Sequence, residues 1–67
     1  MSAFTLIQSA TVWQAIASQM ARGVSQMNAN DLAGALATFD RLVAAAPNFA
    51  EAWNRRATLH FMLGNYE

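Results

Sequence analysis

Residues 47–67, PNFAEAWNRRATLHFMLGNYE, decide the fold of this chain. Pro47 disfavours helical geometry at the residue before it, so a helix that arrives from the N-terminal side ends there. Asn48 is followed three residues later by Glu51, which is a capping-box pattern with asparagine in place of the usual serine or threonine. The stretch therefore predicts a new helix over residues 49–63.

The residues after this helix predict a stop and another start. Gly64 is suited to the left-handed conformation that commonly ends a helix, and Asn65 is a suitable cap for the next one. Only Tyr66 and Glu67 of that fourth helix are present. We therefore expect the 49–63 helix to carry apolar surface that no further helix of this chain covers.

The segment before Pro47 predicts a second helix over residues 32–45. Asn30 tolerates the left-handed conformation that ends a helix, and Asp31 is able to cap the next helix by accepting from its first free N–H groups. We expect Asp40 and Arg41 to face solvent. The apolar side of this helix carries Leu32, Leu36, Phe39, Leu42 and Val43, with the small Ala35 among them.

A first helix is predicted to end near Ala29, but two starting points are open. Ser9 or Thr11 would each cap a start. Alternatively, one long helix begins at Ala3 and measures about 40 Å at 1.5 Å per residue. Its first half would overhang the shorter helices. The apolar face follows a three-and-four spacing through Trp13, Ile16, Met20, Val24 and Met27, to which a long helix would add Phe4, Leu6 and Ile7.

The balance of apolar and charged residues is unusual for so short a chain. Of the 67 residues, 55% are hydrophobic and 12% are charged, against roughly 25% charged in an average soluble domain. A small domain buries only a modest core. We therefore expect the chain either to self-associate or to be a piece of something longer.

The charge distribution argues against two kinds of partner. Four arginines balance four acidic residues and there is no lysine, so no basic stripe is available to neutralise nucleic-acid phosphates. No apolar run reaches the 18 or so residues of a membrane span. Association with a membrane surface is disfavoured because no cation precedes Arg22.

Residues 1–15 lack the positive start of a signal peptide, so we expect a cytoplasmic protein.

No residue pattern predicts an enzyme. The chain has no cysteine and a single histidine, His60, which stands on an apolar helix face and is interpreted as structural. Asp31 is better explained as a helix cap than as a catalytic acid. We therefore predict no catalytic residue, no metal site and no cofactor.

The order of turns and helices resembles the tetratricopeptide repeat, a helix-turn-helix unit of about 34 residues. Residues 50–67 resemble the first half of a unit, with Trp53 as the early aromatic, Ala57 as the small residue at the helix crossing, and LGNYE as the turn. Residues 16–49 resemble a whole preceding unit, in which Gly23 is the small crossing residue. Residues 1–15 form an N-terminal helical extension. The other matching positions are Ala35, Phe39 and Pro47.

Some positions depart from the repeat. Gln19 stands where Trp53 stands one period later, Gln26 stands where His60 stands, and Leu42 replaces a preferred alanine. The match to the family pattern is therefore stronger than the internal repetition. The fold expected from the resemblance is all-α, with antiparallel helix-turn-helix repeats forming a fragment of an α-α superhelix. It has three helices and the start of a fourth.

The resemblance also implies a function, which is interaction with a protein or peptide along a concave groove lined by the first helix of each unit. By this analogy Arg55 binds a carboxylate of a peptide by donating hydrogen bonds to it, although pairing with Glu51 one turn earlier is the alternative. The apolar wall of the groove equally suits burial of the protein's own N-terminal segment. The predicted groove residues are Met20, Val24, Asn54, Arg55, Thr58 and Met62.

Taken with the exposed apolar faces, this resemblance predicts a non-enzymatic adaptor that forms a homodimer or a larger oligomer. The alternative is a structural or assembly subunit, or a truncated fragment of a longer repeat protein, buried in a larger complex.

Overall fold

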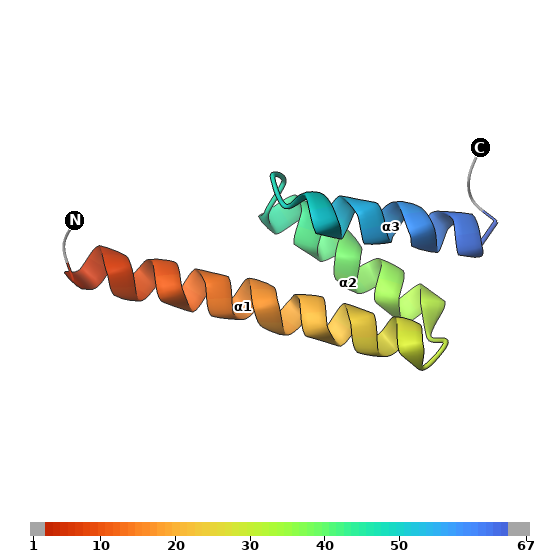
Figure 1. Ribbon diagram of the computed structural model, residues 1–67, viewed down its shortest axis with the longest axis horizontal. Helices are drawn as coiled ribbons and strands as arrows, with labels where there is room; N and C mark the ends of the chain where they lie inside the picture. The colour runs from red at the N-terminus through yellow and green to blue at the C-terminus, as the bar shows by residue number, and fades with distance from the viewer. Residues whose placement is uncertain (1–2, 65–67) are drawn as a thin grey trace.

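A computed structural model describes residues 3–64, with side chains from residue 11 onward, and contains three helices (Figure 1). They are α1 (Ala3–Asn28), α2 (Leu32–Ala45) and α3 (Ala50–Met62). Within this described range there is no strand. The predicted all-α fold is confirmed. The predicted start of a fourth helix falls on residues 65–67, outside the described part.

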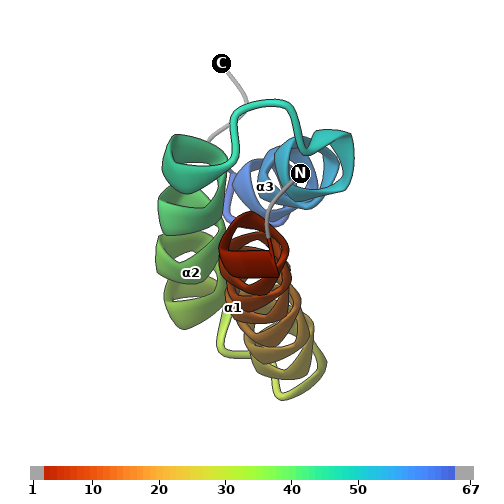
Figure 2. The same ribbon diagram turned by 90° about the vertical axis from the view of Figure 1, so that its left-hand side faces the viewer.

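Consecutive helices run antiparallel, and α2 is the central element. It packs against both α1 and α3, which lie on the same side of it (Figure 2). The molecule measures 47 × 24 × 13 Å, and α1 accounts for the longest dimension (Figure 1). Because α1 and α3 both rest on α2, the space between α1 and α3 is where a groove can form.

The open question about the start of α1 is answered in favour of the long helix. α1 is continuous over 26 residues from Ala3, so neither Ser9 nor Thr11 starts a helix. No glycine or proline occurs before Gly23, so nothing in the backbone interrupts the first turns. Its N-terminal part extends well beyond the ends of α2 and α3 (Figure 1).

The turn between α1 and α2 follows the sequence prediction. Asn30 has a φ of 63°, and its N–H donates to the Met27 carbonyl at 3.0 Å, while that of Asp31 donates to the Gln26 carbonyl at 2.8 Å. These two bonds form a Schellman motif, which satisfies the last carbonyls of α1. The Asp31 carboxylate then accepts from the Gly34 N–H at 3.0 Å and caps α2.

The predicted capping box at the start of α3 is wrong. The residue before the helix is Phe49, and it makes no side-chain cap hydrogen bond. Its N–H donates to the Ala46 carbonyl at 3.0 Å, which closes a four-residue turn with Pro47 and Asn48 as the central residues. Proline is favoured at the first central position of such a turn. Asn48 is therefore used inside the turn and lies one residue too early to cap α3.

The other end of α3 agrees with the prediction to within a residue. The helix ends at Met62, and Leu63 donates to the Leu59 carbonyl at 2.9 Å. Gly64 follows with a φ of 78°, a conformation that glycine adopts without the steric cost paid by other residues. The glycine therefore ends the helix as expected.

The core is contributed mainly by α2. Phe39 is fully buried, and the described residues of α1 that pack against the core are Ile16, Met20, Val24 and Met27. Gly23 of α1 makes the close approach possible, since a Cβ atom there would lie 2.6 Å from the Phe39 ring. The crossing role predicted for Gly23 is thus confirmed. Among residues 11–64 the buried side chains are Ala35, Thr38, Phe39, Leu42 and Val43 of α2, with Ala52 and Leu59 of α3, and Gly23 of α1 is buried beside them.

The packing roles predicted for Trp53 and Ala57 do not appear in the described part of the chain. Trp53 is 44% exposed, and Ala57 is also exposed. The face of α3 that packs on α2 instead carries Ala52 and Leu59, seven residues apart, which are both fully buried. Trp53 and Ala57 lie on a different face, against which no described helix packs.

Candidate functional site

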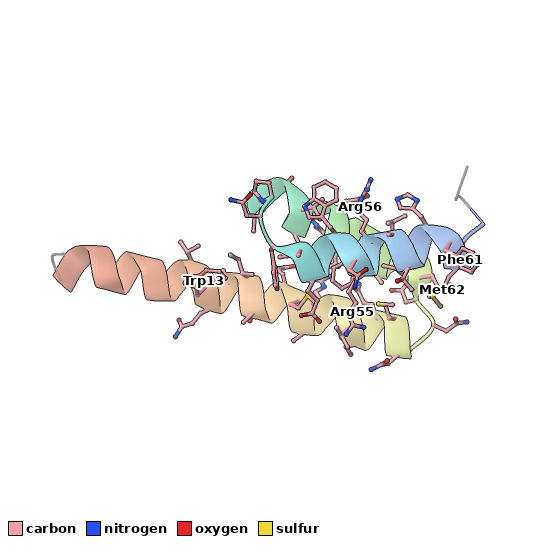
Figure 3. The ribbon with its side chains drawn as sticks, turned by 45° about the horizontal axis from the view of Figure 1, so that its top comes forward. Trp13, Arg55, Arg56, Phe61 and Met62 are labelled. Atoms are coloured by element: carbon pink, nitrogen blue, oxygen red, sulfur yellow. The ribbon has the colours of Figure 1, made fainter. Side chains whose placement is uncertain are left out.

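An open hollow of about 790 Å³ lies over α3 and reaches Met27 near the end of α1. Its α3 wall combines polar and apolar residues on successive turns, so the hollow offers both hydrogen-bonding groups and apolar surface. Figure 3 shows Arg55 on the side of α3 that faces α1. The α3 residues that line it are Glu51, Trp53, Asn54, Arg55 and Thr58, together with Ala50 and Ala57.

Three of the six predicted groove residues line this hollow, and three do not. Asn54, Arg55 and Thr58 all lie along it. Met20 and Val24 are half-buried and pack against the core cluster instead. Met62 is 50% exposed at the end of α3, beyond the hollow.

The sequence prediction missed Met27 and Trp53 as lining residues. Met27 had been placed on the apolar face of the first helix, and its position seven residues after Met20 was the signal that it continued the same row. Trp53 had been expected in the interior. Both errors have the same cause. The angle at which α1 and α3 cross determines which turn of each helix lines the hollow, and the sequence does not contain this angle.

Arg55 retains free hydrogen-bonding capacity in the hollow. Its Nη2 lies 3.5 Å from Glu51 Oε1, and the two side chains are 39% and 54% exposed. An exposed pair at this distance is weak, so Glu51 engages the Arg55 guanidinium only loosely. The Thr58 hydroxyl is occupied locally, because it donates to the Asn54 carbonyl at 3.1 Å.

Trp53, which lines the hollow, also belongs to a cluster around Arg56 that joins α3 to α2 and to the turn between them. The Arg56 Nε donates to Asp40 Oδ1 at 2.6 Å, and the guanidinium lies 5.7 Å from the centre of the Trp53 ring. The indole N–H of Trp53 donates to the Pro47 carbonyl at 2.8 Å. Asp40 and Arg41 are both exposed, as the sequence predicted, and Asp40 in addition pairs with Arg56.

His60 and the acidic residues form no site of their own. The His60 Nε2 atom is buried without a hydrogen-bond partner among the described residues. Over the same range, no group of three or more histidine, cysteine, aspartate or glutamate residues is placed to hold a metal ion. Nor is any helix in residues 3–64 both long enough and apolar enough to cross a membrane.

Comparison with known proteins connects this geometry to a repeat family. The chain is 56% identical over 32 residues to a curated TPR repeat-containing protein of Rhizobium etli. The match covers 48% of this chain and 16% of that protein, so the chain spans a small part of its relative's length. No family model matches, and no solved structure matches. The predicted resemblance to tetratricopeptide repeats is confirmed, over about the length of one repeat.

Proposed function

We propose that this chain is a non-enzymatic module for protein–protein interaction of the tetratricopeptide type, and that it also self-associates. The observation that carries the proposal is the open hollow between α3 and the end of α1, with Asn54, Arg55 and Thr58 along it. Residues 16–49 form one repeat-like unit and residues 50–67 the first half of another. Residues 1–15 form an N-terminal extension. A cytoplasmic location stays a prediction.

The chemistry of the hollow favours one kind of partner segment. Met27 and Trp53 offer flexible and aromatic apolar surface, which suits apolar side chains of a helix or an extended strand. Arg55 offers a guanidinium that is only weakly paired and suits a carboxylate. We therefore expect the preferred segment to carry apolar residues beside one acidic residue or a terminal carboxylate. No cofactor is required.

Selection from a random peptide library displayed on phage tests this function. Peptides that bind the immobilised chain are synthesised and titrated into the ¹⁵N-labelled protein. We expect chemical-shift changes centred on Met27, Asn54, Arg55 and Thr58. Arg55→Glu is expected to weaken the binding of an acidic peptide at least tenfold, which is about the effect of losing one charge-assisted hydrogen bond.

The control for this experiment is Arg22→Glu. Arg22 is exposed on α1 and does not line the hollow, so the same change in charge is expected to leave binding within about twofold. Peptides that bind only elsewhere on the chain would contradict the proposal. An absence of any selected peptide would do the same.

One observation favours the alternative of an assembly subunit. Trp53, Ala57 and Phe61 follow each other at four-residue spacing on α3, and all three are exposed. A contiguous apolar face of this kind marks a protein interface. If it is permanently covered in a complex, the isolated chain will be poorly soluble, and co-expression with its partner will relieve this. A freely soluble chain at millimolar concentration would count against this alternative.

A further inference from the structure

The row of α1 residues that faces α2 continues into the part of α1 that α2 does not reach. Ile16, Met20 and Met27 pack against the core, and Gly23 touches Phe39. Trp13 precedes Ile16 by three residues, so it lies on the same face of the helix. Yet Trp13 is 64% exposed. Figure 3 shows it on the segment of α1 beyond the other helices.

The uncovered segment begins where α2 ends. Ala45, the last residue of α2, borders a small hollow that also touches Ala15 and Ile16 of α1. Residues 3–14 of α1 therefore lie beyond the end of α2, a length of about 18 Å at 1.5 Å per residue. By helical spacing alone, the sequence continues this row at Leu6 and Ser9, which precede Trp13 by seven and four residues.

We propose that this segment is covered by the same segment of a second copy of the chain, packed antiparallel, with the two-fold axis close to Ser9. The proposal rests on the self-association proposed above and specifies its surface. Residues 3–14 of the partner lie on α1 in line with α2, as a continuation of it. Each copy does the same for the other, so the interface is self-complementary and closes as a dimer.

The charges of the chain favour this arrangement. No ionisable side chain occurs between residue 1 and Arg22, so pairing the two segments buries no charge and brings no like charges together. The antiparallel packing of the two α1 segments also determines which helix ends meet. The partner's α1 runs in the same direction as α2, so the N-terminal end of the partner's α1 meets the C-terminal end of α2.

The two helix ends that meet are also electrostatically complementary. The first turn of α1 has no acidic residue, and the last turn of α2 has no basic residue. Each end of a helix carries about half an elementary charge, positive at the N-terminus and negative at the C-terminus. Placing these ends together compensates both without any charged side chain.

The size of the proposed interface sets how strong the dimer is, and the small residue at the centre of the interface sets how closely the two helices approach. Two helices in contact over about 18 Å form an interface at the small end of the range for specific complexes. We therefore expect a reversible dimer with a dissociation constant in the micromolar range. Ser9 near the axis lets the two backbones approach closely, as Gly23 does where α1 crosses α2.

Sedimentation equilibrium of the full chain up to about 300 µM tests the dimer, a range chosen for a small interface. We expect a monomer–dimer equilibrium between 7.3 kDa and twice that mass. Trp13→Glu is expected to raise the dissociation constant at least thirtyfold, the effect of removing an aromatic anchor. Gln14→Glu adds the same charge one residue further, off the row, and is expected to leave the constant unchanged within about threefold.

Disulfide trapping tests the position of the axis. Because the chain has no native cysteine, an introduced cysteine can form a disulfide only with the same residue of a second copy. Ser9→Cys is expected to form a covalent dimer on mild oxidation, because its two copies lie within disulfide reach. Ser18→Cys is the matched control. It lies nine residues, about two and a half turns, further on and so on the opposite face, and it is expected to stay monomeric under the same conditions.

The outcomes separate this inference from the broader proposal. A chain that remains monomeric throughout the concentration range overturns both the dimer and the proposed self-association. A dimer that survives Trp13→Glu, or that is trapped through Ser18 and not Ser9, overturns only the arrangement inferred here. Far-UV circular dichroism confirms that each variant is folded, which the exposure of Trp13 leads us to expect.

Discussion

The two halves of α1 belong to one uninterrupted helix but differ in what covers them. The C-terminal half packs on α2, where Gly23 touches the buried Phe39. In the N-terminal half, Val12 is 56% exposed and Trp13 is 64% exposed. The apolar spacing is the same in both halves, so it is the shorter length of α2, 14 residues against 26, that separates them. Apolar periodicity therefore predicts a face, and a neighbouring helix decides whether that face is buried.

The largest expected loss in the free energy of unfolding comes from removing a core side chain that packs against the C-terminal half of α1. Phe39→Ala removes a fully buried ring and is expected to destabilise the chain by about 3–5 kcal/mol, as large-to-small aromatic changes do. Urea unfolding followed by circular dichroism measures it. Such a loss is comparable to the whole free energy of unfolding of a chain this small. The variant is therefore expected to be largely unfolded when the loss is at the upper end of this range.

The matched change in the other half is Trp13→Ala. In dilute solution, where the chain is monomeric, we expect it to change the free energy of unfolding by less than about 0.5 kcal/mol. If this variant were as unstable as Phe39→Ala, the N-terminal half would be packed within its own chain, and the distinction between the halves would fail.

The next effect tests the close approach of α1 to α2. Gly23→Ala places a Cβ atom 2.6 Å from the Phe39 ring, and overpacking of this kind costs about 1–3 kcal/mol. The alanine also gains up to about 1 kcal/mol of helix propensity, so a net loss shows that the steric conflict dominates. Thermal unfolding measures the balance. Ser18→Ala, on the exposed face of α1, has the propensity gain alone and is expected to be slightly stabilising.

A smaller effect tests the polar contact between the same two helices. Thr38 is fully buried, and its hydroxyl lies 2.6 Å from Gln26 Oε1 and 3.1 Å from the Gly34 carbonyl. Thr38→Val keeps the shape and removes the hydroxyl, so we expect a loss of about 1 kcal/mol. Thr58→Val is the control, since its hydroxyl is exposed and bonds only within α3. Equal losses in the two variants would mean that the contact with Gln26 contributes nothing.

The smallest effect concerns the link between α2 and α3. Asp40→Asn weakens the ion pair with Arg56, whose side chains are 50% and 35% exposed. Exposed pairs contribute at most about 1 kcal/mol, and salt screens them. We expect a loss of about 0.5 kcal/mol at low ionic strength that disappears in molar salt, measured by urea unfolding. A loss that does not depend on salt would show that the hydrogen-bond geometry matters more than the charge.

Local sequence signals predicted the turns well and tertiary contacts poorly. Asn30, Asp31 and Gly64 were identified correctly, because left-handed backbone and helix capping depend on one or two residues. Asn48 failed because two local signals compete there, and the turn that Pro47 favours takes precedence over the cap. The start of α1 stayed open because Ser9 and Thr11 are compatible with both a cap and a helix interior.

In the candidate site, the predictions that held concern residues adjacent on one helix. Asn54, Arg55 and Thr58 share the hollow because their spacing within α3 places them on neighbouring turns. Met20 and Val24 were assigned to the hollow on the analogy with the repeat family, and they pack against the core. Which residues of α1 face α3 depends on how both helices cross α2, and no spacing within α1 contains that information.

The sequence by itself determined that this chain is helical, where its turns lie and which residues form each apolar row. These properties depend on backbone preferences and on helical spacing, which act over a few residues. Only the tertiary structure decided that Trp13 and Trp53 are exposed, that Asp40 pairs with Arg56, and that Met27 borders the hollow. Those outcomes depend on helix lengths and crossing angles, which arise when separate segments compete to cover the same apolar surface.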